Sequence, residues 1–162
     1  MYSLPLPGPG LCCLLVCVQQ RTPLKRRIWS SIAVPFGAVY AALCATVYFV
    51  ELTLVIPHQL SGTIGNLRIL VFGTGTFLYA VDILSYWFMS LAGVFAAPAF
   101  NGSRLENWIH WLLLANWFMV VGTLIMMFWP QFAFFNGLWV FTIPVPAIFL
   151  AVLFQRDQRR AV

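Results

Sequence analysis

The chain has 162 residues, of which 62% are hydrophobic and only 8% are charged. Soluble domains carry about a quarter charged residues, and a soluble chain of this length has too little interior to bury so many large apolar side chains. These numbers exclude an ordinary soluble domain and predict an integral membrane protein whose main partner is the lipid bilayer. The net charge of +5 does not indicate nucleic-acid binding, because the basic residues gather beside apolar segments, as they do at the flanks of membrane spans.

Residues 1–27 are expected to form a disordered basic arm. They are rich in Pro and Gly, and their one apolar run, from Leu11 to Val18, has eight residues. A helix needs about 20 residues to cross the hydrocarbon of a membrane, so this run is too short. It is not a secretory signal either, because the positive charges follow the apolar run instead of preceding it.

Residues 28–154 are predicted to form an all-α, four-span transmembrane bundle. The apolar segments cover about 28–56, 71–100, 108–129 and 132–154, and each is long enough to cross a membrane. Pro57 and the polar residues after it predict an outer loop that reaches Thr76. The connection at Trp129-Pro130-Gln131 is so short that the third and fourth spans are expected to form an antiparallel hairpin. Residues 155–162 form a basic C-terminal tail.

The distribution of Lys and Arg predicts the orientation of the bundle. Only Arg68 lies in a predicted outer loop, while the other basic residues lie before the first span, between the second and third, or after the fourth. Basic residues favour the cytoplasmic side of a membrane. Both the N-terminus and the C-terminus are therefore expected in the cytoplasm.

The loop between the second and third spans contains a helix start signal. Ser103-Arg-Leu-Glu106 fits a capping box, in which the serine side chain bonds to the Glu106 backbone and the Glu106 carboxylate reaches back to the serine N–H. Glu106 and His110 are one helical turn apart, so they are expected to pair.

Neither a cofactor nor a metal is predicted. A b-type haem in a helical bundle needs two His at the same depth, whereas His58 and His110 lie at opposite ends of the spans, about 30 Å apart. No Cys and His pattern has metal-ligand spacing. No nucleophile lies beside a base and no phosphate-binding loop is present, so catalysis is not expected.

Two carboxylates lie inside the predicted spans, Glu51 in the first and Asp82 in the second. At about 1.5 Å per residue, Asp82 is expected about 6 Å and Glu51 about 10 Å to the outer side of the midplane, so they can meet if the spans pack together. An acid in a span costs on the order of 2.5–3.5 kcal/mol on insertion scales, and it normally faces the bundle interior or water.

Helical spacing places further polar groups near these acids. Tyr79 and Tyr86 share a face of the second span with Asp82, and Tyr48 shares a face of the first span with Glu51. Asn116 lies near the middle of the third span. The candidate proton site therefore consists of Asp82, Glu51, Tyr48, Tyr79, Tyr86 and Asn116.

Three interpretations of this site stay open. It can be a proton or cation site, as intramembrane acids often are, which predicts a small proton-linked transporter. It can instead be a set of interhelical hydrogen bonds worth about 1 kcal/mol each. It can also meet a basic residue of another chain, in a homo-oligomer or a complex. The last two make the chain a non-catalytic structural or partner-binding subunit.

Three stretches, RRIWSSIAV, YFVELTLVIPHQLSG and VFAAPAFNGSRLENWIHWLLLANW, resemble a group of small multi-pass membrane proteins of bacteria. The resemblance covers about Arg26 to Arg156, with Asn107 and His110 departing from the more basic pattern of the group. It implies a multi-pass protein of the bacterial cytoplasmic membrane. The group has no known substrate, so the resemblance implies nothing about chemistry.

Overall fold

All the secondary structure in the described part of the chain is helical. A computed structural model describes residues 7–73, 75–129, 141 and 144–161. The α-helices are α1 (Pro7–Arg21), α2 (Arg27–Val50), α3 (Ile56–Leu60), α4 (Phe77–Ala96), α5 (Arg104–Phe128) and α7 (Pro144–Ala161). Short segments complete them: the 3₁₀ helices η1 (Leu24–Arg26), η3 (Gly65–Leu70) and η4 (Ala97–Ala99), and the π-helical turn η2 (Glu51–Val55). The all-α prediction is confirmed.

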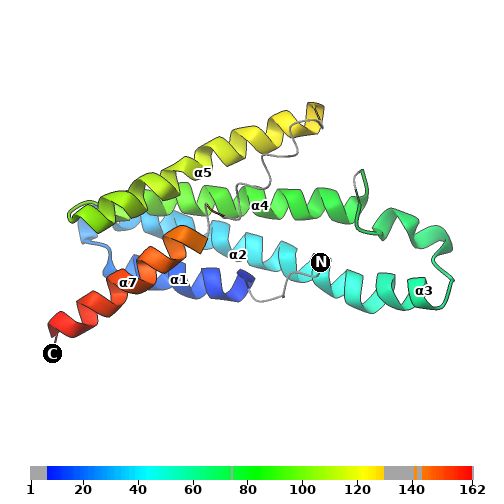
Figure 1. Cartoon of the computed structure of the whole chain (residues 1–162), viewed down its shortest axis with the longest axis horizontal. Coiled ribbons are helices and arrows are strands. Elements are labelled where there is room, and N and C mark those ends of the chain that lie inside the picture. Colours follow the sequence, from blue (N-terminus) through cyan, green and yellow to red (C-terminus); the bar gives the residue numbers. More distant parts are fainter. Residues whose placement is uncertain (1–6, 74, 130–140, 142–143, 162) are drawn as a thin grey trace.

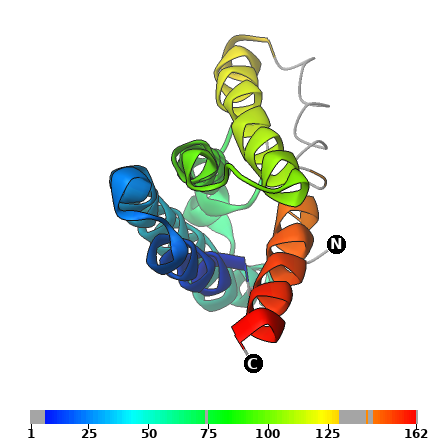
Figure 2. The same cartoon turned by 90° about the vertical axis from the view of Figure 1, so that its left-hand side faces the viewer.

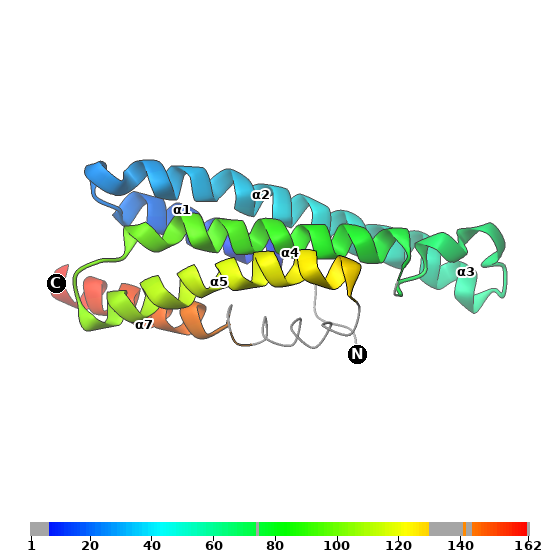
Figure 3. The same ribbon diagram turned by 90° about the horizontal axis from the view of Figure 1, so that it is seen from above.

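The helices lie side by side with α4 in the middle. Helix α2 continues through η2 into α3, α4 returns beside it, and α5 lies along the other side of α4 (Figures 1 and 3). Seen along the bundle, α1 lies against α2, and α7 lies next to α5 (Figure 2). We call the end with Lys25, Arg26, Arg27 and Arg104 the basic end, and the end with α3 and η3 the loop end.

Three helical stretches are long and apolar enough to cross a membrane: Leu24–Leu60, Phe77–Ala99 and Arg104–Ile125. At about 1.5 Å per residue the second is about 34 Å long, close to the about 30 Å of hydrocarbon in a bilayer, and the first exceeds it by about 25 Å. The predicted fourth span and the hairpin before it fall partly on residues 130–140 and 142–143, outside the described residues. The part of the predicted fourth span that the structure describes, from Pro144 on, lies in α7. The apolar part of this helix is Pro144–Arg156.

The distribution of side chains is that of helices packed in lipid. Small and polar side chains such as Ala33, Ser85 and Ser90 are fully buried, while Trp111 and Phe118 are 66% and 77% exposed. Helices in a membrane associate through small residues and polar contacts, because lipid removes the hydrophobic drive to bury large side chains. This pattern and the three long helices indicate a membrane protein.

The prediction of a disordered arm is wrong for Pro7–Arg21, which form α1 along α2. Leu11, Leu15 and Val18 recur at helical spacing, and Leu15 and Val18 are buried. Gly37 of α2 leaves room for α1, since a Cβ there would overlap the Leu15 side chain. The apolar run Leu11–Val18 is too short to span a bilayer, but it is long enough to pack as a helix along α2. Residues 1–6 lie outside the described residues.

The basic end is tied together through Glu106. The Ser103 capping box is confirmed: the Glu106 N–H donates to Ser103 Oγ, and the Ser103 N–H donates to Glu106 Oε2. Glu106 Oε1 accepts a hydrogen bond of 2.7 Å from Arg21 Nη2 of α1. The predicted pairing of Glu106 with His110 is wrong, because His110 Nδ1 bonds instead to the Ala97 carbonyl, at 2.8 Å.

Candidate functional site

The two intramembrane acids meet at the interface between α2 and α4. Glu51 is the first residue of the π-helical turn, and Asp82 lies in the second turn of α4. Both side chains are half-buried, and their chain neighbours Val50 and Val81 pack against one apolar cluster. Asp82 lies six residues from the centre of Phe77–Ala99, or about 9 Å toward the loop end. Two carboxyl groups therefore lie on packed segments in the loop-end half of the bundle.

A buried polar contact fixes the two helices beside these acids. Ser85 Oγ donates a 2.7 Å hydrogen bond to the main-chain oxygen of Asp82, and it lies 3.4 Å from Cys44 Sγ of α2. Both Cys44 and Ser85 are buried. The Asp82 carboxyl itself takes part in no hydrogen bond with the described residues. The polar connection between the helices therefore runs through Ser85, and the carboxyl group is left for other partners.

Two of the three predicted tyrosines join the acids. Tyr86 interacts electrostatically with Asp82 and with Tyr48. Its ring lies 6.1 Å from that of Tyr40, and both Tyr48 and Tyr86 pack against a core cluster that contains Tyr40 and Cys44. The site therefore has phenol groups on the basic-end side of the carboxyl groups.

Tyr79 lies on the loop-end side of Asp82. Its ring makes an edge-on contact with Phe72, with 5.8 Å between ring centroids. Phe72 comes just after η3, so Tyr79 packs the loop segment onto the start of α4. We assign it a packing role at the loop-end rim of the site.

Asn116 is not brought to this site. It faces Gly93 of α4, where a Cβ would stand 3.5 Å from Asn116 Nδ2, and Gly93 is eleven residues from Asp82, about 16 Å along the helix. Asn116 Nδ2 donates to the Leu112 and Leu113 carbonyls of its own helix, at 3.2 and 3.3 Å. Its side chain belongs to a different part of the bundle.

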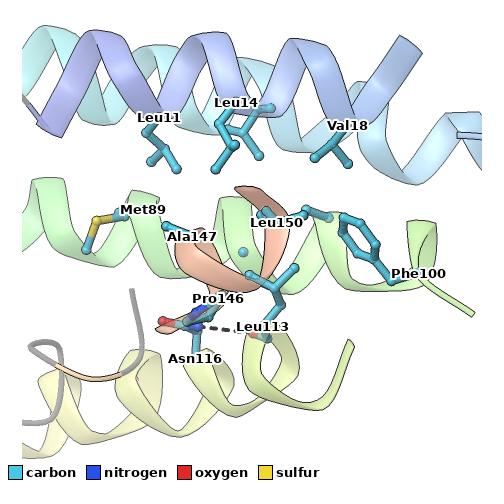
Figure 4. Close-up of a pocket in the computed structure, with 13 residues that line it drawn as sticks. Leu11, Leu14, Val18, Met89, Phe100, Leu113, Asn116, Pro146, Ala147 and Leu150 are labelled. Carbon is cyan, nitrogen blue, oxygen red and sulfur yellow. Dashed lines mark hydrogen bonds between the residues drawn. The ribbon is translucent and has the colours of Figure 1, made fainter. Parts of the chain in front are cut away.

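An apolar cavity of about 60 Å³ lies where Asn116 points (Figure 4). Leu11, Leu14, Leu15 and Val18 of α1 form one wall, and residues of α4, α5 and α7 form the others. Sequence reasoning missed this cavity, because it exists only when α1 is docked. The signal that points to it is the helical spacing of leucines in the short apolar run.

The π-helical turn at Glu51 has a local cause. The Ile56 N–H bonds to the Glu51 carbonyl, five residues back. Pro57 follows at once, and a proline inside a helix lacks an N–H and clashes with the carbonyl four residues before it. A wider turn relieves this clash, so the helix continues to Leu60 instead of ending near Pro57, where the sequence predicted the outer loop to begin.

The described residues contain no candidate metal site. Among them, no group of three or more His, Cys, Asp and Glu side chains could hold a metal ion. Comparison with protein-family models gives no match. Comparisons with curated proteins and with solved structures give none either. The function must therefore be argued from the site itself.

Proposed function

We propose that this chain is a small proton-linked transporter of the bacterial cytoplasmic membrane, a four-span protein with both termini inside. The observation that carries the proposal is that Glu51 and Asp82 lie on segments that pack together, where their neighbours Val50 and Val81 join one apolar cluster. The resemblance to small bacterial membrane proteins supports the location, and the concentration of Lys and Arg at the basic end supports the orientation.

A pair of carboxyl groups suits reversible proton binding. Charged side chains in membrane spans are costly and mark ion pathways when they occur. When two acids interact, the binding of a proton to one depends on the state of the other, so a small change in the distance between them alters proton affinity. Movement of α4 against α2 would change that distance. This coupling is what a transporter needs to link proton binding to a conformational change.

The contacts of Asp82 favour this role over a purely structural one. An acid that held helices together would donate or accept interhelical hydrogen bonds, yet its carboxyl group has none with the described residues. The helices are tied instead by Ser85 and Cys44. The phenol groups of Tyr48 and Tyr86 supply hydroxyl groups close to the acids, where a proton or a polar solute can be held.

Proton flux in proteoliposomes tests the proposal. A pH gradient is imposed across liposomes that contain the full chain, and its collapse is followed with a trapped pH-sensitive dye. The wild-type protein should collapse the gradient faster than empty liposomes, and Asp82→Asn and Glu51→Gln should lose most of this flux. Asp157→Asn is the matched control, because it neutralises an acid of α7, outside the acidic pair.

Two checks make the result decisive. Circular dichroism and gel filtration must show that each variant keeps its helices and its particle size, so that a loss of flux is not a loss of fold. If Asp82→Asn keeps the wild-type flux, the acidic pair does not carry protons and the proposal is wrong. Loss of a co-purifying protein in that variant would then indicate a partner-binding subunit.

A further inference from the structure

A second cavity lies at the basic end and is polar. It has a volume of about 220 Å³, far more than the about 10–15 Å³ that one water molecule needs. Arg21, Thr22 and Arg26 line it from the end of α1 and from η1. Asn101 and Glu106 line it from the start of the α5 region. The cavity therefore brings five polar side chains together at the basic end of the bundle.

The charge of this cavity favours an anion. Arg21 and Arg26 contribute two positive charges and Glu106 one negative charge, so the lining carries a formal charge of +1. Glu106 is already paired with Arg21. Arg26 is half-buried and makes no ion pair within the part of the chain that the structure describes. A guanidinium group of this kind is well suited to bind phosphate oxygens in pairs.

The polar cavity adjoins the apolar cavity described above. Val18 and Phe100 line both of them, so the two share a wall. The apolar cavity is formed almost entirely by leucine, alanine and other apolar side chains, and its volume of about 60 Å³ leaves room for a few methylene groups. Figure 4 shows Val18 and Phe100 at one end of that cavity. A polar, basic compartment and an apolar one thus lie next to each other.

We propose that these cavities bind one acidic phospholipid, whose phosphate group lies against Arg21 and Arg26 and whose acyl chain enters the apolar cavity. A free phosphate ion would satisfy the arginines but leave the apolar cavity unused, whereas a lipid uses both. The basic end is also where the bilayer supplies acidic headgroups, if it faces the cytoplasm as proposed. The inference concerns a different site from the acidic pair and does not rest on the transport function.

Three charge variants separate a specific site from general attraction. Arg26→Gln should lower the affinity for acidic lipid roughly fivefold, the effect expected for one basic residue at an acidic surface. Lys25→Gln removes the same charge from the neighbouring residue, which is exposed and does not line the cavity, and it should change affinity less than twofold. In chains whose α1 is docked, Glu106→Gln should raise the affinity roughly fivefold, because it removes the negative charge from the lining.

The sign of the Glu106→Gln effect is informative. The glutamine oxygen can still accept the Ser103 N–H, so the helix cap is kept while the charge is lost. A residue that only supported the fold would not raise lipid affinity when changed. The apolar compartment is tested separately by Ala147→Leu, which adds bulk on α7 inside the cavity.

The experiment is native mass spectrometry of the full chain released from detergent micelles that contain equal amounts of phosphatidylglycerol and phosphatidylcholine. The expected result is one retained phosphatidylglycerol per chain, with retention reduced roughly fivefold in Arg26→Gln, weakened in Ala147→Leu, and kept in Lys25→Gln. Parallel samples contain glycerol 3-phosphate or inorganic phosphate at the lipid concentration, and these should not displace the lipid.

Three outcomes overturn the proposal. Equal retention of the two lipids would exclude a site for acidic headgroups. An equal decrease of phosphatidylglycerol retention in Arg26→Gln and Lys25→Gln would show that general surface charge, and not a specific site, attracts the lipid. Displacement by glycerol 3-phosphate or inorganic phosphate, with no effect of Ala147→Leu, would identify a site for soluble phosphates in place of a lipid.

Discussion

The ion pair between Arg21 and Glu106 is predicted to hold α1 in its groove. It joins the last residue of α1 to the first turn of α5 with an N–O distance of 2.7 Å. The two side chains are 28% and 16% exposed, so water screens the pair only in part. Exposed pairs are worth about 0.2–1 kcal/mol, and removing one partner of a fully buried pair costs about 3–5 kcal/mol. This pair lies between these limits, at about 1–2 kcal/mol.

The perturbation is Arg21→Gln, alone and combined with Glu106→Gln. A loss of about 1–2 kcal/mol corresponds to about a 5–30-fold increase in the population with α1 undocked. Hydrogen exchange of the full chain in phosphatidylcholine micelles, followed by mass spectrometry, measures this opening as faster exchange of α1 amides. Exchange in the central turns of α5 should not change. The double variant should open no more than Arg21→Gln does, because both changes remove the same contact.

Lys25→Gln serves as the control, since it removes a nearby positive charge that forms no described ion pair. The reasoning is refuted if Arg21→Gln and Lys25→Gln give the same α1 exchange, or if the effects of Arg21→Gln and Glu106→Gln simply add. Either result would mean that the contact between Arg21 and Glu106 does not hold α1.

Three further predictions concern stability. Asp82→Leu should leave the thermal midpoint in detergent unchanged, since the carboxyl makes no described hydrogen bond, whereas loss of an interhelical bond would cost about 1 kcal/mol. Gly37→Val should destabilise α1 docking by about 1–3 kcal/mol because its side chain overlaps Leu15, while Gly122→Val, with open space around it, should not alter α1 exchange. Ser103→Ala should lower the unfolding free energy by about 1 kcal/mol through loss of the helix cap, and Ser103→Asp should restore most of it.

The helices and one cap were predictable from sequence because their causes are local. Membrane spans follow from the length of an apolar run, and the Ser103 cap follows from four consecutive residues. The similar depth of Glu51 and Asp82 was predicted in the same way, from the distance of each acid to the end of its span. These properties do not depend on how distant elements pack.

Other features depend on packing and could not be predicted in this way. The docking of α1 needs the space at Gly37 and the partner Glu106, which is 85 residues from Arg21 in the sequence. Asn116 was expected beside the acids, but α5 packs along α4 in a register that places it at Gly93, and this register depends on how the two helices pack. The helix continues past Pro57 because the π-helical turn before it relieves the clash of the proline ring with the preceding turn.

The central claim is that Glu51 and Asp82 act as one proton-binding pair, and infrared titration of the carboxyl bands in lipid tests it most directly. The band of Asp82 is the one that is lost in Asp82→Asn. The account predicts that Glu51→Gln shifts the midpoint of this band. Glu106→Gln, at the basic end, should leave that midpoint where it is. An unchanged midpoint in Glu51→Gln would contradict the account, because the two acids would then titrate independently.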